Sequence, residues 1–375
     1  MRKGVIGLTA AGVVLVAASA VARFAVLPAV DRVPANLDTT SAYAGTLSMV
    51  NPTAMAAGDA THAVLTNVPV TVRQHVKTIK VSGGAAVMSN DLTVTGADGT
   101  ALITSNHTYA VDRTTLETAP APAGVKVDKS AGLPVSFPVR PRPVDYAWWD
   151  STTLTTAPAK YAATETHQGR RTYVYNATNT GPVKDSGSIG ALPPSLPKAA
   201  LGVLAGYLPD ALKRLLTSSM SLLPDTLKLS YNSTTDTTLW VDAATGTVID
   251  VHEKQVVTAT VDLPLAGGAV LPSVLTLDVH STDAAKNAKT ARDNESALNL
   301  VGTVAPIVLA AIGMVALIGA LVLGRRRRAG GADESGGPQA PSTPDLPPHD
   351  GHTVAVPVQP DAETTRVVPT DPPGE

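Results

Sequence analysis

The chain has 375 residues, a formal net charge of −2 at pH 7 and no cysteine. The lack of thiols excludes disulfides, thiolate metal sites and cysteine nucleophiles, and the balanced charge gives no overall basic field of the kind that nucleic-acid binding requires. Threonine is abundant in the middle of the chain, which favours β-strands there.

The N-terminus combines a short basic start with a long apolar run. Residues 4–22 are uncharged, and beyond Arg23 apolar residues continue to position 27. This length approaches the ~20 residues of a membrane-spanning helix and exceeds the ~7–15 residues of a signal-peptide core. We predict a transmembrane signal anchor over residues 4–27, with residues 1–3 in the cytoplasm. The alternative is a signal peptide that is cleaved at the A-x-A pattern Ala18-Ser19-Ala20.

We expect residues 28–300 to form one β-rich extracytoplasmic domain. Residues 29–45 read as an extended lead from the membrane. Glycine-bearing turns between β-branched runs predict hairpins within residues 91–104 and 239–251. Residues 160–177 predict a further pair of strands, joined by a turn at Gln168 and Gly169.

A proline-rich segment and a pair of tryptophans follow one another in the middle of this domain. Proline lacks the amide donor that a sheet needs, so residues 119–145 are predicted to be an ordered surface loop. In the next run, Tyr146–Asp150, the adjacent Trp148 and Trp149 would face opposite sides of a strand. The two tryptophans are interpreted either as a core anchor or as an aromatic contact for a ligand or partner.

Residues 191–223 change from strand-like to helical periodicity. We predict a helical insert that either caps the sheet or forms an amphipathic surface helix against lipid or a partner. The apolar positions expected to make this contact are Leu204, Leu208, Leu212 and Leu216.

A second apolar span follows an alanine-rich helical stretch at residues 282–300. Residues 301–323 carry no charge, and Thr303 is their only clearly polar side chain. As a helix they would span ~34 Å at ~1.5 Å per residue, which fits a hydrocarbon core ~30 Å thick. The arginines that follow favour the cytoplasmic side of the membrane, and they are Arg325, Arg326, Arg327 and Arg328.

Residues 324–375 are predicted to be cytoplasmic. From Gly331 onward there are eight acidic residues, one arginine and ten prolines. With so little apolar surface to bury, this acidic, proline-rich tail is predicted to be disordered.

The chain carries no strong catalytic or cofactor motif. It lacks H-E-x-x-H, a Walker loop, G-x-S-x-G and a dinucleotide fingerprint. Asp242 and Glu253 are spaced like the ends of a calcium loop, but Ala244 and Gly246 occupy ligand positions. We therefore expect no enzyme activity, no catalytic residue, no cofactor and no metal site.

Two short motifs, Y-x-W-W-D at Tyr146–Asp150 and D-x-x-T-G at Asp242–Gly246, stand between the two apolar spans. In this layout the chain resembles the actinobacterial DUF3068 family, which is labelled as PorA-type porins in some classifications. The resemblance covers roughly residues 1–328. It implies no catalytic residues, and through its label it implies channel formation.

These observations predict an α+β membrane protein with a β-rich extracytoplasmic domain and a helical insert, flanked by two transmembrane helices. Both termini would lie in the cytoplasm, and Gly302, Gly313 and Gly319 would let the two helices approach closely. The first functional hypothesis is a non-enzymatic protein of the cell envelope that binds or moves lipid-like ligands or scaffolds the envelope. The alternative is a porin-like channel. Expected partners are the bilayer and a lipid or cell-wall ligand, and the oligomeric state is left open.

Overall fold

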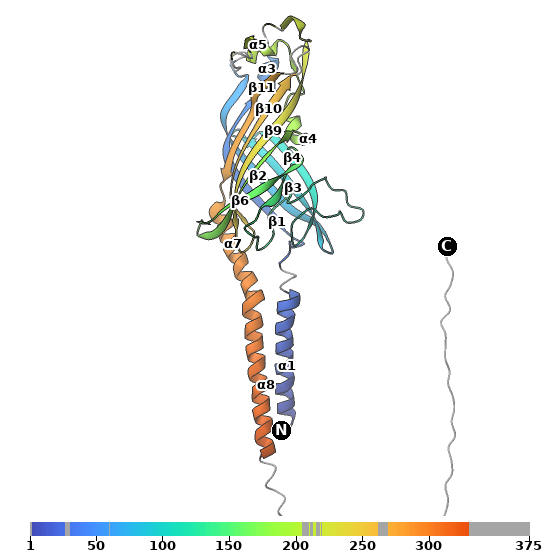
Figure 1. Cartoon of the computed structure of the whole chain (residues 1–375), viewed down its shortest axis with the longest axis vertical. Coiled ribbons are helices and arrows are strands. Elements are labelled where there is room, and N and C mark those ends of the chain that lie inside the picture. The colour runs from blue at the N-terminus through green and yellow to red at the C-terminus, as the bar shows by residue number, and fades with distance from the viewer. Residues whose placement is uncertain are drawn as a thin grey trace, which may run out of the picture. The chain divides into compact units, whose positions relative to one another are not determined.

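The structure is a computed structural model in which one long helix precedes a large curved sheet and another follows it (Figure 1). It describes residues 2–26, 31–59, 61–204, 210, 213–214, 218, 220–261 and 269–329. The acidic tail expected from Gly331 onward, and the greater part of the predicted helical insert beyond Leu204, lie outside these residues.

One antiparallel sheet of 11 strands makes up the β-rich domain. Its strand order is β4-β3-β2-β1-β11-β10-β9-β7-β6-β5, with β8 paired to β9 off this path. The strands are β1 (Asp38–Val50), β2 (Val64–Ser82), β3 (Ala85–Gly96), β4 (Ala101–Asp112), β5 (Tyr146–Asp150), β6 (Thr155–His167), β7 (Arg170–Pro182), β8 (Ser195–Pro197), β9 (Thr226–Asp242), β10 (Val248–Val261) and β11 (Ala269–Ser281).

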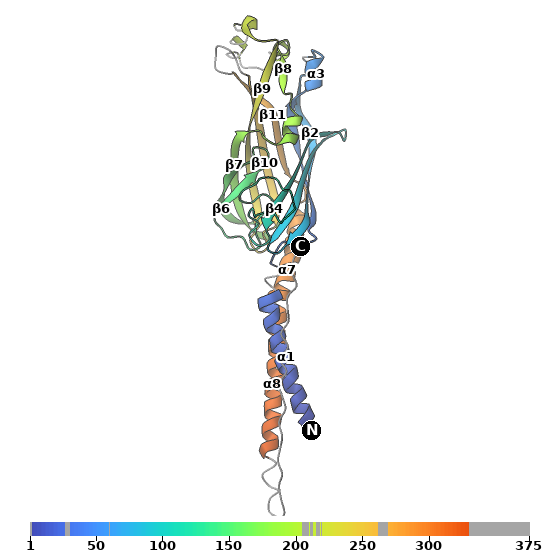
Figure 2. The same cartoon turned by 90° about the vertical axis from the view of Figure 1, so that its right-hand side faces the viewer.

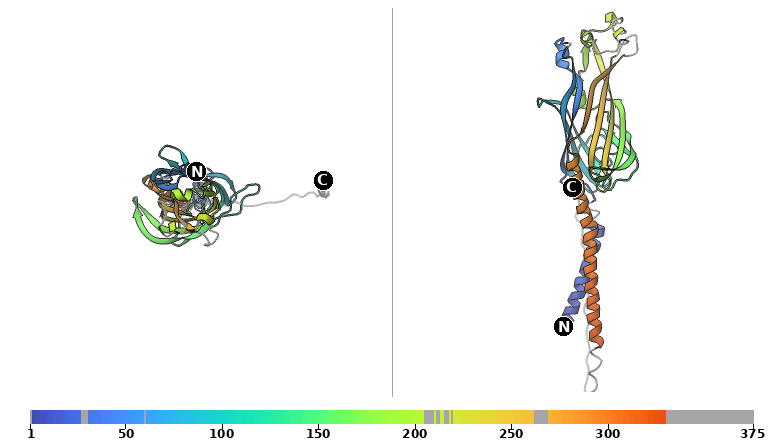
Figure 3. Two further views of the ribbon diagram at one scale, coloured as in Figure 1. Left: turned by 90° about the horizontal axis from the view of Figure 1, so that it is seen from above. Right: turned by 90° about the vertical axis from the view of Figure 1, so that its left-hand side faces the viewer.

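Alternation along the strands separates an inner face from an outer face. On β9, Ser233, Thr235 and Thr237 are buried, whereas the neighbouring Asn232 and Asp236 are exposed. This period of two is the pattern of a sheet with one face turned inward. The sheet curves round its inner face, and we call it the half-barrel (Figures 2 and 3).

The open side between β4 and β5 is bridged by the proline-rich segment. The Ala119 amide donates to Ala110 O on β4 at 2.9 Å, and the Thr118 amide donates to Gly132 O at 2.8 Å. The Leu133 amide then donates to Ala147 O on β5 at 2.8 Å. The segment therefore joins the two sheet edges through backbone hydrogen bonds, and we call this closure the seam.

The three predicted hairpins are confirmed. β3 and β4 flank the turn after Gly96, β6 and β7 meet at Gln168 and Gly169, and β9 and β10 meet after Asp242. Gln168 and Gly169 both have positive φ, as a tight two-residue hairpin turn requires.

Two expectations were wrong in detail. Residues 38–45, expected in an extended lead, belong to strand β1; all of them pair with β2, and residues 43–45 also pair with β11. Part of the predicted helical insert is a strand, because β8 (Ser195–Pro197) pairs with β9 and extends the sheet. Local helical periodicity was outweighed there by the unpaired edge that the start of β9 offers.

Two long apolar helices flank the half-barrel in sequence. The first candidate membrane span covers Leu8–Val26, and the second lies in a continuous helical stretch, Ala284–Leu323. Both have the length and composition to cross a membrane. The helices are α1 (Arg2–Val21), α3 (Pro52–Ala56), α4 (Ser186–Gly190), α5 (Ala200–Leu204), α7 (Ala284–Asn299) and α8 (Ala305–Ala329), with π-helical turns η1 (Ala22–Val26) and η4 (Leu300–Val304) and a 3₁₀ turn η3 (Met220–Leu222).

The two long helices pack against each other, as the glycine pattern predicted. A Cβ built on Gly313 would lie 2.9 Å from Gly12 O, so the two backbones meet at a pair of glycines. Nearer the half-barrel, Arg23 Nη1 donates to Gly302 O at 2.8 Å, and Ser19 Oγ donates to Pro306 O at 2.7 Å. These bonds give the polar side chains of the first helix partners on the second.

Candidate functional site

The half-barrel encloses a cavity of about 660 Å³. This volume lies within the ~300–1,000 Å³ range of small-molecule binding sites. Its wall is built from inward-facing side chains of β1, β2, β3, β4, β7, β9, β10 and β11, together with the proline-rich segment, the end of β5 and one side of α7. No single stretch of sequence contributes a dominant part of the wall.

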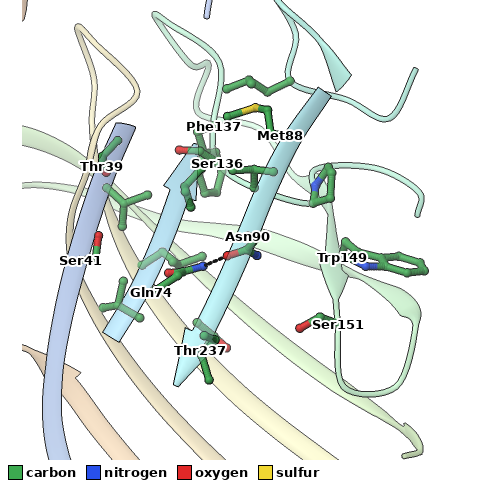
Figure 4. Close-up of a pocket in the computed structure, with 18 of the residues that line it drawn as sticks. Thr39, Ser41, Gln74, Met88, Asn90, Ser136, Phe137, Trp149, Ser151 and Thr237 are labelled. Carbon is green, nitrogen blue, oxygen red and sulfur yellow. Dashed lines mark hydrogen bonds between the residues drawn. The ribbon is translucent and has the colours of Figure 1, made fainter. Parts of the chain in front are cut away.

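Much of the wall is apolar. Phe137 from the proline-rich segment stacks on Trp148, with ring centroids 5.5 Å apart. Met88 lies on the same side of the cavity (Figure 4). Other apolar lining residues are Val33, Leu37, Val72, Val76, Leu92, Val94, Ile103, Leu239, Val251, Leu277 and Val279.

A line of neutral polar side chains crosses one part of the wall. Tyr43 donates its hydroxyl to Gln74 Oε1 at 3.0 Å, and Gln74 Nε2 donates to Asn90 Oδ1 at 2.9 Å (Figure 4). Burial raises the pKa of Tyr43 to about 12, so its hydroxyl stays protonated at neutral pH. These three residues therefore form a fixed hydrogen-bond chain across β1, β2 and β3.

Glu253 on β10 places a carboxyl group inside the cavity. Burial raises its pKa to about 7, and the negative charge of Asp150 adds to this shift. Its side chain keeps some accessible surface because it faces the cavity. A long hydrogen bond of 3.5 Å from Thr237 Oγ1 is its contact on the wall.

One end of the cavity lies where the chain continues from the half-barrel to the two long helices, and we call this end the mouth. Arg32, Val33 and Leu37 just before β1, and Lys286 and Asn287 on α7, line this mouth. The start of β1 and the end of β11 belong to the same end of the sheet, because the two strands are antiparallel neighbours. The mouth is thus bordered by the segments that lead to η1 and to α8.

One arginine ties the half-barrel to α7. Arg170 is 11% exposed, and its Nε and Nη1 atoms lie 2.7 Å from Asp242 Oδ2 and Glu295 Oε2, respectively. Although burial opposes ionisation of Asp242, hydrogen bonds from Arg170 and Thr245 lower its pKa. The D-x-x-T-G turn is therefore connected, through one guanidinium group, to the helix that borders the mouth.

His107 on β4 contacts both the proline-rich segment and the start of α4. Its Nε2 lies 3.3 Å from Asp185 Oδ1 at the start of α4, and its Nδ1 lies 3.5 Å from Asp128 Oδ2 in the proline-rich segment. The ring stacks on Tyr109 with centroids 5.5 Å apart. Interaction with Asp185 raises the pKa of His107 despite its partial burial.

A family model described as Porin PorA matches residues 5–322 of the chain. The chain belongs to this family. The match includes the whole half-barrel and the residues of the cavity, so the family likeness extends over every part of the structure described above except the first residues of α1 and the last turns of α8.

Comparisons of this PorA-family chain with other proteins add no functional argument. No curated protein matches it. The full-length peroxisomal multifunctional enzyme type 2 from Drosophila melanogaster is similar at 10% identity over 64% of this chain and 37% of that chain, with a TM-score of 0.12. A MaoC domain protein dehydratase from Chloroflexus aurantiacus is similar at 14% identity over 72% of this chain and 80% of that chain, with a TM-score of 0.13. Both TM-scores are too low to support a shared fold.

The structure places the sequence-predicted contact residues of this PorA-family chain in different regions. Trp148 and Trp149 both border the cavity, and Trp149, which is 7% exposed, donates its indole N–H to the Tyr109 hydroxyl at 3.3 Å. Leu204 is the last residue of α5. Leu208, Leu212 and Leu216 lie outside the described residues, and Arg325, Arg326, Arg327 and Arg328 form part of the last turns of α8.

Sequence reasoning missed the polar part of the cavity wall in this PorA-family chain. The sequence does not single out Asn179 or Thr235, and it marks Glu253 only by its spacing from Asp242, because alternation shows which residues share a face but not that the face encloses a space. In the described part of the chain, no group of three or more His, Asp or Glu side chains could hold a metal ion.

Proposed function

We propose that this chain is a non-enzymatic, membrane-anchored protein of the cell envelope whose half-barrel binds a lipid-like molecule. The observation that carries the proposal is the internal cavity of about 660 Å³, with a largely apolar wall and a mouth bordered by the segments leading to the two apolar helices. An apolar molecule leaving a bilayer along these helices would meet the mouth first.

The proposed topology has two spans, an extracytoplasmic half-barrel and both termini in the cytoplasm. Basic residues support this orientation at each end, because Arg2 and Lys3 precede the first span and four arginines follow the second. The exposed large apolar side chains of the described residues gather on α1 and α8. This distribution supports helices, rather than strands, as the parts that contact lipid.

The outer face of the half-barrel also supports this arrangement. A membrane-spanning barrel carries an apolar band on its outward-facing positions. Here the outward positions form polar pairs instead, such as Thr178 with Asp236 at 2.6 Å and His252 with Asp278 at 2.9 Å. Such a surface is suited to water, so the curved sheet would act as a container outside the bilayer.

The three tryptophans of the chain allow a direct test with a brominated lipid, which quenches indole fluorescence on contact. Trp148 and Trp149 border the cavity, whereas Trp240 stacks on His167 and donates to Glu165 on the outer face. In the full-length Trp240→Phe variant in detergent, titration with a dibromostearoyl monoacylglycerol should quench the remaining fluorescence saturably.

The matched control retains only the outer tryptophan. In Trp148→Phe/Trp149→Phe, emission from Trp240 should be unaffected, because Trp240 lies on the outer face of the half-barrel, away from the cavity. Probe dissolved in the detergent micelle around the two long helices meets no tryptophan, because neither helix contains one. Failure of the probe to quench Trp148 and Trp149, or equal quenching of Trp240, would reject lipid binding in the cavity.

Channel formation is the second candidate, and the family description favours it. The described apolar spans offer few polar side chains to line a water-filled path, which weighs against a pore built from these helices. Reconstitution of the full-length protein in planar bilayers tests the candidate. Reproducible unitary conductance steps whose number increases with protein load would establish channel formation. Their absence at high load would rule it out.

A further inference from the structure

In the described part of the chain, three side chains on the cavity wall contain a buried polar atom without a hydrogen-bond partner. One is His107, whose Nε2 atom lies 3.3 Å from the carboxylate of Asp185; the other two have no charged group so placed. Asn179 is 3% exposed and its Nδ2 atom is unpartnered, and Thr235 is 6% exposed and its Oγ1 atom is unpartnered. Both residues line the cavity. Because buried polar groups in proteins are nearly always hydrogen-bonded, these atoms indicate a bound molecule that supplies their partners.

The two residues are close neighbours of the cavity carboxyl group. Asn179 on β7 lies directly opposite Thr235 on β9, at the ~4.5–5.5 Å separation of a cross-strand pair. Glu253 lies diagonally across from Thr235, because its inward neighbour on β10, Gln255, is the residue paired with Thr235. Gln255 itself already donates to two side chains, at 3.1 and 3.2 Å. We call Asn179, Thr235 and Glu253 the polar wall.

The chemistry of the polar wall restricts the head group that it can hold. The Nδ2 atom of Asn179 only donates, so it requires an acceptor, which an ammonium group lacks. An ionised Glu253 only accepts, so it requires a donor, which an ionised carboxylate lacks, and it repels other negative charges. A hydroxyl group both donates and accepts, and therefore satisfies both residues.

The packing beyond the polar wall sets the direction of the rest of the ligand. Farther along β10 from Glu253, Val257 and Ala259 are buried in an apolar cluster with Leu47 and Leu275, which fills the interior on that side. In the opposite direction the cavity continues past Phe137 to the mouth. An apolar chain attached to a head group at the polar wall therefore has room only toward the mouth.

We propose that the cavity holds the uncharged, hydroxyl-bearing head group of an amphiphile against Asn179, Thr235 and Glu253, with its apolar tail directed toward the mouth. This assignment rests on the proposed lipid-binding function and adds the head-group class and the orientation. It identifies the polar wall as the part of the cavity that selects the ligand.

Three probes with the same dibrominated acyl chain and different head groups test the assignment. They are the monoacylglycerol, the free fatty acid and the primary amine, each titrated at pH 8 into the full-length Trp240→Phe protein. The monoacylglycerol should bind about tenfold more tightly than either charged probe, a difference of ~1.4 kcal/mol. Glu253→Gln should raise the affinity for the fatty acid, because the like charge is removed.

A matched pair of threonines separates head-group contact from general damage to the sheet. Thr235→Val should weaken monoacylglycerol binding by roughly five- to tenfold, the value of one hydrogen bond. Thr234→Val changes the adjacent residue, whose hydroxyl faces outward and lies 3.2 Å from that of Thr180. This control should leave binding unchanged.

The outcomes distinguish the two proposals. All three probes could quench equally, with no effect of Thr235→Val or Glu253→Gln. This result would support lipid binding in the cavity but overturn the head-group assignment. Tightest binding of the amine or of the fatty acid would overturn it in the same way. Absence of quenching by every probe would reject the proposed function itself, and the assignment with it.

Discussion

Glu253 is an ionisable group whose position is explained by the cavity rather than by an ion pair. Among the salt bridges of the described residues none involves Glu253, and the charge that contributes to its raised pKa is the like charge of Asp150. By contrast, the buried Asp242 is paired with Arg170 and receives amide hydrogen bonds from its own turn. The carboxylate of Asp242 is thus stabilised by neighbouring groups of the fold, whereas that of Glu253 is available to bind a molecule in the cavity.

The raised pKa of Glu253 predicts a pH-dependent stability. The folded chain holds this proton up to a pH of about 7, whereas the unfolded chain releases it near 4.5. The unfolded state therefore binds fewer protons between these values, and the free energy of unfolding falls as the pH rises through this window. In Glu253→Gln, the decrease in Tm between pH 5 and pH 8 should be smaller than in the wild-type chain.

Thermal unfolding at both pH values checks this prediction. Titration of His107 acts on both proteins alike, so the difference between them isolates Glu253. Glu117→Gln, at an exposed position, is the matched control and should follow the wild type. A decrease in Tm of the same size in Glu253→Gln and the wild type would contradict the prediction.

At the scale of elements, the half-barrel is closed by a segment without regular secondary structure. Prolines keep residues 119–145 from becoming a strand, yet its amides and carbonyls still connect β4 to β5. The close approach depends on Gly132, which has a φ of 62° and lies against the backbone of Ala147. A Cβ at this position would come within 2.2 Å of Ala147 O.

Alanine substitutions at two glycines of the same segment should have unequal effects. Gly124 also has positive φ, 73°, but a Cβ there would meet nothing within 4 Å. Gly124→Ala should therefore destabilise the fold only by the roughly 1–2 kcal/mol of a left-handed backbone conformation. Gly132→Ala should lower the free energy of unfolding by clearly more, because the proline-rich segment must also move away from β5 to make room for the new Cβ atom. Urea unfolding of both variants measures the difference, and equal losses would argue against the seam.

In the whole molecule, the chain enters and leaves the half-barrel at the same end, because β1 starts there and β11 ends there. The two spans beyond these points pack on each other. The segment Ala284–Leu323 is helical throughout, so α7 at the mouth continues into the second span. Arg170 links the D-x-x-T-G turn to α7. The mouth of the cavity and the pair of spans are therefore parts of one connected framework.

An engineered disulfide should link the two spans within one chain. A Cβ built on Gly313 lies 3.1 Å from the Cβ atom of Leu15, close to the ~3.5–4.5 Å of a disulfide. Because the chain has no cysteine, oxidised Leu15→Cys/Gly313→Cys should give a single intramolecular crosslink that a reducing agent reverses. The mobility of the denatured protein on a gel detects the closed loop.

The control places the second cysteine on the other side of α8. Val315 is 70% exposed, so Leu15→Cys/Val315→Cys should not form the intramolecular bond. Crosslinking of the control pair in place of the test pair would contradict the packing of the two helices.

Features that depend on local pattern could be predicted from the sequence. The two apolar spans follow from length and hydropathy, the three hairpins from glycine-bearing turns between β-branched runs, and the family from the overall layout. Trp148 and Trp149 were also singled out, because a pair of large aromatics in an aromatic-poor chain is conspicuous. These signals lie within short stretches and need no knowledge of distant partners.

The tertiary structure decided what lies inside the sheet. The start of strand β1 was not predicted, because its inward side chains include Thr39 and Ser41, which line a cavity rather than an apolar core. The unpartnered Asn179 and Thr235 look like surface residues of a threonine-rich strand until the curvature of the sheet turns them inward. That curvature arises from strand register and from the seam, which are set by contacts between residues far apart in the chain, and so the cavity could be found only in the folded molecule.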